Sequence, residues 1–198
     1  MSASPVIIAT GGANLASLQF ALQRLGFDAP VTEDRETIES ASHVLLPGVG
    51  AARDAMNRLD EAQLSSLIPE LKQPVLGICL GMQLLFSGSD EDSADCLGII
   101  EGQAHRFAQK PDLPVPQMGW NQLCLEADSA LLEGVDNGGY AYFIHSYAVP
   151  PGSYTRATAD YGGSFSAVVE ESNFFGTQFH PERSSRLGAR ILGNFLRL

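Results

Sequence analysis

Residues 74–86 constrain the fold of this chain more than any other stretch, because the spacing of their apolar side chains changes in the middle. The apolar run 75–78 (VLGI) is typical of a buried strand in a parallel sheet. From Leu80 to Leu85 the leucines follow at helical spacing instead. The change falls on Cys79, so the sequence predicts a strand that turns abruptly into a helix at this cysteine.

Glycines flank the predicted turn on both sides. Gly77 and Gly81 each lie two residues from Cys79, and residues without a Cβ make room for a side chain on a tight, strained turn. At the start of a helix, unpaired backbone N–H groups and the helix dipole favour a thiolate. Most free cysteines are small buried hydrophobic residues. The pattern around Cys79 therefore needs a second motif before it indicates a nucleophile.

That second motif is His180-Pro181-Glu182, which follows a strand predicted at 174–179. In extended backbone, residues two apart point the same way, and Pro181 favours that backbone. A carboxylate beside an imidazole fixes the tautomer of the ring and stabilises its protonated form. We therefore expect His180 to act as a base that Glu182 orients. His145 is a rival base, but it has no carboxylate within two residues.

A glycine-rich loop at 47–51 (PGVGA) directly follows the apolar run 43–46. Glycines on both sides of Val49 allow the backbone N–H groups of this loop to be exposed or rotated. Such a loop can stabilise the oxyanion that forms at a nucleophile on a neighbouring strand. A plain connection between two elements is the alternative interpretation.

The order of the predicted elements indicates the fold class. Strands alternate with helices in the first half of the chain, at 6–9, 14–24, 29–32, 35–42, 43–46, 52–59, 63–71 and 75–78. The turn 10–14 joins the first pair, and 87–95 has the composition of an acidic surface loop. Beyond Cys96, short strands predict antiparallel additions to the same sheet, and 185–196 predicts a closing helix. We expect an α/β fold with an open, mixed, largely parallel sheet, flanking helices and an antiparallel C-terminal half, in a single domain spanning 1–198.

Composition excludes several classes of function. The formal net charge is −11, which argues against binding to nucleic acid or to an anionic membrane surface. The sequence shows no signal peptide and no apolar stretch long enough to span a membrane. The cysteines number three, without a Cys-x-x-Cys pair, which argues against a disulfide framework and a structural zinc site. These features favour a cytoplasmic location.

Residues 77–83 (GICLGMQ) together with 178–182 (QFHPE) resemble the class I glutamine amidotransferases. Within that class, the chain is similar to the glutaminase subunits of imidazole glycerol phosphate synthase, which act in histidine biosynthesis. The stretches 46–51 (LPGVGA), 118–121 (MGWN) and 142–147 (YFIHSY) carry this narrower resemblance. The resemblance spans almost the whole chain.

The resemblance implies a catalytic triad of Cys79, His180 and Glu182. It also implies an oxyanion hole formed by the backbone N–H of Leu80 and that of Val49 or Gly50. The groups expected to hold the amino-acid end of glutamine are Gln83, Glu91, His145, Ser146 and Tyr147.

The resemblance further implies a heterodimer with a cyclase subunit, a β/α barrel that receives ammonia through a dry passage. Trp120, Asn121 and the loop 47–51 are expected to face that partner. We expect neither a metal ion nor an organic cofactor.

Other functions stay open on the sequence alone. The chain could serve another amidotransferase of the same class, such as anthranilate or aminodeoxychorismate synthase. It could also be a non-catalytic regulatory module of the same fold, although intact Cys79, His180 and Glu182 weigh against that. A thiol peptidase or γ-glutamyl hydrolase is chemically allowed, but Gln83 beside the turn argues against it.

Overall fold

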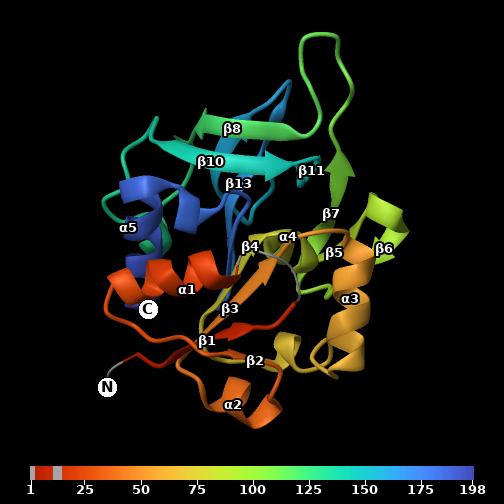
Figure 1. Cartoon of the computed structure of the whole chain (residues 1–198). Helices are drawn as coiled ribbons and strands as arrows, with labels where there is room; N and C mark the ends of the chain where they lie inside the picture. The colour runs from red at the N-terminus through yellow and green to blue at the C-terminus, as the bar shows by residue number, and fades with distance from the viewer. Residues whose placement is uncertain (1–2, 11–14) are drawn as a thin grey trace.

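A mixed β-sheet runs through the centre of the computed structural model, which describes residues 3–10 and 15–198 (Figure 1). Its strands are β1 (Pro5–Ile8), β2 (Val31–Thr32), β3 (His43–Gly48), β4 (Val75–Cys79), β9 (Cys124–Leu125), β12 (Thr155–Asp160), β13 (Ser164–Glu171) and β14 (Phe174–Thr177). The helices that flank the sheet or cross its end are α1 (Leu15–Arg24), α2 (Arg35–Ser40), α3 (Ala52–Glu61), α4 (Leu80–Leu84) and α5 (Ser185–Phe195).

Within the described residues, the strand order of this main sheet is β2-β1-β3-β4-β14-β13-β12-β9. The strands from β2 to β14 in that order pair in parallel, and β13, β12 and β9 are added antiparallel. The predicted fold class, α/β with a mixed and largely parallel sheet, is therefore confirmed. Strand β4, which ends in Cys79, lies in the interior of the sheet.

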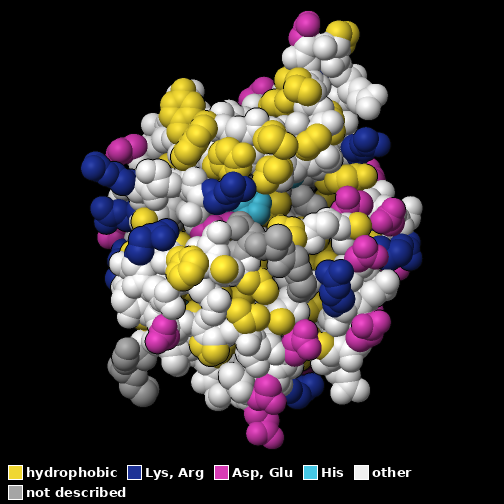
Figure 2. All heavy atoms as spheres, viewed as in Figure 1, with side chains coloured by type: hydrophobic (Ala, Val, Ile, Leu, Met, Phe, Trp, Pro, Cys, Tyr) yellow, Lys and Arg dark blue, Asp and Glu magenta, His cyan; other side chains and the backbone are white. Residues whose placement is uncertain are grey.

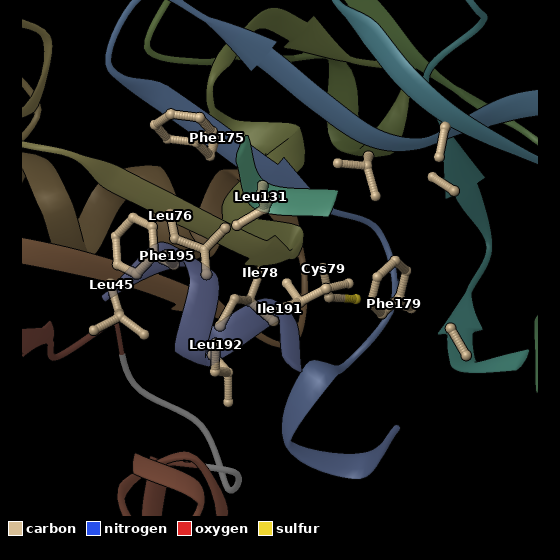
Figure 3. Close-up of a cluster of buried hydrophobic side chains, with 14 of the residues drawn as sticks. Leu45, Leu76, Ile78, Cys79, Leu131, Phe175, Phe179, Ile191, Leu192 and Phe195 are labelled. Atoms are coloured by element: carbon tan, nitrogen blue, oxygen red, sulfur yellow. The ribbon is translucent and has the colours of Figure 1, made fainter. Parts of the chain in front are cut away.

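Alternate residues along the inner strands face opposite sides of the main sheet. Ile7, Leu45 and Leu76 belong to one buried hydrophobic cluster, which also contains apolar side chains of α1 and α5. Their neighbours on the same strands belong to a second cluster with side chains of α2 and α3. Figure 3 shows the first cluster, in which Leu45 and Leu76 lie close to side chains of α5. Covering on both faces explains why these strands are apolar without interruption.

The second half of the chain departs from the expectation that all its strands extend the first sheet. Strand β10 (Tyr140–His145) pairs antiparallel with β8 (Gln117–Gln122) in a sheet of their own. A further sheet has the order β11-β7-β5-β6, formed by β5 (Phe86–Ser89), β6 (Ala94–Asp95), β7 (Ile100–Arg106) and β11 (Tyr147–Ala148). Alternating polarity predicts a strand but does not specify its partner, so the sequence left this division open.

The helix predicted at 63–71 is wrong. The structure has turns there, followed by the short 3₁₀ helix η1 (Ile68–Glu70), and Gln63 has a φ of 57°. Pro69 explains the difference, because its ring clashes with the preceding turn of an α-helix and it has no N–H to donate. The apolar spacing that suggested a helix reflects the burial of Leu64 and Leu67.

The acidic stretch 87–95 is only partly a surface loop. It contains most of β5 and all of β6, joined through the 3₁₀ helix η2 (Glu91–Ser93), and Ser89 is fully buried. Residues 11–14 of the predicted turn lie outside the described part of the chain. Among the described helices, none is long and apolar enough to cross a membrane.

Candidate active site

Cys79 occupies a strained turn at the junction of β4 and α4, as the sequence predicted. Its φ of 55° and ψ of −111° lie outside the regions that a residue with a Cβ normally adopts. A Cβ on Gly81 would lie 1.7 Å from the carbonyl oxygen of Leu46, and one on Gly77 would lie 2.6 Å from that of Gly81. Both glycines are therefore required by the close approach of backbone around the cysteine.

Strand register brings the other parts of the site to the same edge of the sheet. Gly48 at the end of β3 pairs with Cys79, so the loop 47–51 begins beside the sulfur-bearing residue. On the other side, Thr177 of β14 pairs with Ile78. The segment that follows Thr177 therefore also passes beside Cys79. Open α/β sheets bind ligands at this edge, the carboxyl ends of their strands.

His180 and Glu182 form a buried pair next to Cys79. The Nδ1 of His180 lies 2.9 Å from Oε1 of Glu182, and the two side chains are 5% and 3% exposed. The side chain of Cys79 is close enough to the imidazole to raise its pKa. The backbone N–H of His180 donates to the carbonyl of Tyr142 at 3.0 Å, which fixes the ring's position relative to β10.

The backbone between His180 and Glu182 is not the extended form that we expected. Pro181–Arg183 form the 3₁₀ helix η4, so Glu182 reaches His180 within a tight turn. Proline suits the first position of a helical turn as well as an extended segment, because its φ fits both. The predicted pairing is present, but the backbone conformation predicted for it is wrong.

The surroundings of His180 favour its protonated form. Burial lowers the pKa of His180, but hydrogen bonding and charge interactions with Cys79 and Glu182 outweigh burial and raise the pKa to about 10. An imidazolium beside the sulfur is the arrangement that activates a cysteine nucleophile.

The sulfur of Cys79 opens onto a cavity of about 290 Å³, a size that suits an amino acid. The cysteine side of this cavity borders the hydrophobic cluster, where Figure 3 shows the sulfur pointing toward Phe179. All the residues that we expected in the oxyanion hole or in contact with glutamine line this cavity. The complete lining consists of Val49, Gly50, Cys79, Leu80, Gln83, Glu91, Pro116, Ile144, His145, Ser146, Tyr147 and His180.

Glu91 has a further contact that the sequence did not reveal. Its Oε2 accepts a hydrogen bond of 2.9 Å from the backbone N–H of Ala52, the first residue of α3. Burial raises the pKa of Glu91 although this hydrogen bond lowers it. The carboxylate therefore ties η2 to the helix that follows the loop 47–51.

His145 differs from His180 in its electrostatic surroundings. Its Nδ1 lies 2.7 Å from the carbonyl oxygen of Tyr147, so this nitrogen carries the hydrogen. Burial lowers the pKa of His145 to about 4, and the nearby His180 acts in the same direction. At neutral pH the ring of His145 is uncharged and a weak base, unlike that of His180.

Gln178 is a part of the site to which sequence reasoning assigned no role. It is fully buried, and its Nε2 lies 3.8 Å from the sulfur of Cys79. Its Oε1 accepts from Nε2 of Gln83 at 3.0 Å. Its position two residues before His180 places it near the site in the sequence but does not specify its contacts.

Trp120 and Asn121 lie on β8, outside the cavity. Trp120 is 53% exposed and packs edge-on against Tyr142, with ring centroids 5.8 Å apart. Met118 and Tyr140 are also largely exposed. Figure 2 shows hydrophobic side chains gathered over the region of β8 and β10 on this face of the molecule. Within the described ranges, no group of three or more metal-binding side chains occurs.

Comparison with known proteins identifies the family. The glutamine amidotransferase class-I family model matches residues 12–198. Imidazole glycerol phosphate synthase subunit HisH 1 from Vibrio vulnificus (strain YJ016) is 47% identical over 199 residues, which cover 98% of this chain and 97% of that protein. The HisH subunit from Xanthomonas campestris pv. campestris (strain 8004) is 49% identical over 192 residues, covering 97% and 96%.

Solved structures show the same fold at lower sequence identity. A glutamine amidotransferase has a TM-score of 0.75 at 20% identity, with coverage of 98% of this chain and 97% of that chain. PurLQS from Thermotoga maritima has a TM-score of 0.74 at 18% identity, with coverage of 100% and 99%. The fold follows from these structures, and the finer relationship follows from the sequence matches. This chain belongs to the class I glutamine amidotransferases and, within them, to the HisH subunits of imidazole glycerol phosphate synthase.

Proposed function

We propose that this chain hydrolyses the side-chain amide of glutamine through a thioester on Cys79, with His180 and Glu182 as the other members of a catalytic triad. The observation that supports this proposal is the contact between the Cys79 side chain and a buried imidazole, itself paired with Glu182 at 2.9 Å. Cys79 and His180 line a cavity large enough for an amino acid. By this reaction the chain acts as the glutaminase subunit of imidazole glycerol phosphate synthase, in histidine biosynthesis.

Acylation begins when the Cys79 thiolate attacks the side-chain amide carbon of glutamine. The C–S bond forms as the carbonyl becomes an oxyanion, and the C–N bond then breaks. His180 donates its Nε2 proton to the departing nitrogen, so ammonia leaves and a γ-glutamyl thioester remains. Glu182 stabilises the imidazolium that this step requires and keeps its ring in place.

Deacylation uses the same groups in reverse. The neutral imidazole of His180 takes a proton from water, and the resulting hydroxide attacks the thioester carbon. The C–S bond breaks, glutamate leaves, and the sulfur returns to the thiolate beside a protonated His180.

The oxyanion of both steps lies near the backbone N–H of Leu80 and that of Val49 or Gly50. Leu80 follows the cysteine directly, and Gly50 has a φ of 94°, which a glycine adopts without strain. Each donor lowers the barrier by roughly 3 kcal/mol. Because Gly48 and Gly50 allow the Val49 peptide to rotate, we expect the second donor to be aligned only when the partner subunit is bound.

The proposed partner is a cyclase subunit that consumes the ammonia. The curated relatives are named as subunits of imidazole glycerol phosphate synthase. The exposed apolar surface around Trp120 suits a protein interface rather than bulk water, and Asn121 adjoins it. Free ammonia would be protonated in bulk water, so a closed passage between the subunits is required.

A reducing cytoplasm fits a mechanism that depends on a free thiol at Cys79.

A glutaminase assay of the purified chain tests this function, with and without the cyclase subunit and its ligand. We expect low turnover of glutamine by the chain alone, a large increase on adding the partner, and no turnover by Cys79→Ser under either condition. Complementation of a histidine-requiring strain, compared with a tryptophan-requiring strain, separates this function from that of anthranilate synthase. Glutaminase activity in Cys79→Ser, or growth only of the tryptophan-requiring strain, would contradict the proposal.

A further inference from the structure

Gln178 is a buried amide that touches the reacting sulfur. It directly follows β14, and its backbone N–H donates to the carbonyl of Ala167 on β13 at 2.9 Å. Pairing of Thr177 with Ile78 carries the next residue, Gln178, to the side of Cys79. Its Nε2 lies 3.8 Å from the sulfur, a distance at which an amide N–H can donate to this large atom. The position is therefore fixed by the backbone of two strands rather than by a mobile loop.

Neighbouring groups determine which end of the amide faces the sulfur. The carbonyl oxygen of Tyr147 can only accept, and it lies 2.9 Å from one atom of the Gln83 amide, which must therefore be the nitrogen. The second hydrogen of that nitrogen points to Gln178 at 3.0 Å, so the facing atom of Gln178 must be its oxygen. The remaining end of Gln178 is then its NH₂ group, and this group faces Cys79. The Nδ1–H of His145 donates to the same Tyr147 carbonyl at 2.7 Å and anchors the chain of bonds.

The sulfur therefore has two polar neighbours that favour opposite protonation states. The carbonyl of Ile144, 3.7 Å away, accepts a hydrogen bond from the thiol. The NH₂ group of Gln178 donates to the sulfur, and a donor interacts more strongly with an anion than with a neutral thiol. The donor also faces the sulfur when it becomes the leaving group of deacylation.

We propose that Gln178 donates a hydrogen bond that favours the thiolate of Cys79, and that Gln83 is the positioning residue that orients this donor. The proposal rests on the function proposed above for Cys79. It assigns Gln83 a role within the protein, since both hydrogens of its amide are used by Tyr147 and Gln178. Only the oxygen of Gln83 then remains to meet the substrate.

Other titratable groups lie around the same sulfur and cavity. His180 lines the same cavity as Cys79 and is paired with Glu182. His145 is uncharged at neutral pH, because burial lowers its pKa to about 4. Glu91 lines the same cavity. Replacing the amide of Gln178 removes none of these titratable side chains.

Alkylation of the full-length chain by iodoacetamide across a pH series tests the proposal, because only the thiolate reacts. The extent of reaction at Cys79 is read from its own peptide by mass spectrometry. Cys124 is exposed and reacts in the same samples, which makes it an internal standard. Three variants are compared with the wild type. Gln178→Met keeps the length of the side chain and removes the donor, and Gln178→Glu replaces the donor with a negatively charged acceptor. Gln83→Met removes the hydrogen bond that orients the donor.

We expect Gln178→Met to raise the midpoint pH of Cys79 alkylation by about one unit, which means about tenfold slower reaction at pH values below both midpoints, because a hydrogen bond to a charged group is lost. Gln178→Glu should raise the midpoint further, and Gln83→Met should raise it less. Asn194→Leu is the matched control. It removes another buried amide, which donates to the carbonyls of Leu131 and Glu133, and it should leave the midpoint unchanged.

Unchanged midpoints in folded Gln178→Met and Gln178→Glu would overturn the proposal, while normal labelling of wild-type Cys79 by a glutamine-analogue electrophile would keep the glutaminase function. Failure of that labelling would instead overturn the glutaminase function, and this inference with it. If Gln178→Met does not fold, Gln83→Met decides the matter, because it leaves Gln178 in place.

Discussion

The two histidines of the cavity have opposite charge states at neutral pH, although they line the same space. His180 is held protonated by Cys79 and Glu182, whereas burial among aromatic rings keeps His145 neutral. The difference divides their tasks. His180 can move a proton, and His145 can hold the carbonyl of Tyr147 without introducing a second positive charge beside the sulfur.

The neutral state of His145 makes the protein sensitive to acid. Its folded pKa of about 4 lies below the ordinary value of 6.5, so the unfolded chain binds more protons between these values. The free energy of unfolding is therefore reduced as the pH falls from about 6.5 toward 4, by about 2 kcal/mol at about pH 5. His180 stays protonated in the folded state over this range, and its unfolded form is half-protonated at about pH 6.5, so it opposes the slope only in the upper part of the range.

Chemical denaturation at pH 7 and at about pH 5 measures this effect, with His145→Asn as the comparison. Asparagine retains an N–H donor for Tyr147 but does not titrate. Since the carboxylates are the same in both proteins, their contributions cancel in the difference. We expect the variant to lose less stability than the wild type on acidification, and equal losses would contradict the assigned charge state.

At the scale of the elements, the turn at Cys79 depends on how closely β3, β4 and α4 approach one another. A methyl group on Gly81 would lie 1.7 Å from the carbonyl oxygen of Leu46, which is backbone in the interior of the sheet. Such an overlap requires the helix to move away from the sheet. The position of Cys79 relative to His180 would change with it.

Gly81→Ala should therefore lower the free energy of unfolding by at least about 3 kcal/mol and strongly reduce the labelling of Cys79 by a glutamine-analogue electrophile. Gly163→Ala is the matched control, because a Cβ at Gly163 meets no atom within 4 Å, and it should have stability close to that of the wild type. Thermal melts and labelling of both variants provide the measurement. A Gly81→Ala protein with wild-type stability and labelling would show that the turn is less tightly packed than described.

The same elements show what a sequence can predict. The turn at Cys79 was predictable because its signals are local, namely the change of apolar period and the spacing of Gly77 and Gly81. The contacts of Gln178 and Glu91 were not predictable, because they depend on the register of β14 against β4 and on where η2 lies relative to α3. The pairing of His180 with Glu182 was predictable from their separation, although the intervening 3₁₀ turn was not.

At the scale of the whole molecule, we propose that residues 1–198 form one domain. The two hydrophobic clusters lie on opposite faces of the same strands, since Ile7, Leu45 and Leu76 belong to one cluster and their neighbours Val6, Ile8, Val44, Leu46 and Val75 belong to the other. Loss of either cluster would expose one face of the shared strands to water. The two halves of the core should therefore unfold together.

Matched substitutions in the two clusters test this cooperativity. Leu22 on α1 belongs to the first cluster and Leu59 on α3 to the second. At most 1% of the surface of either residue is exposed. We expect Leu22→Ala and Leu59→Ala each to shift one common thermal transition downward, with a loss of about 2–5 kcal/mol apiece. Far-ultraviolet circular dichroism and tryptophan fluorescence should follow the same curve in the wild type and in both variants. Two transitions, each shifted by only one of the substitutions, would show instead that the faces of the sheet belong to separate folding units.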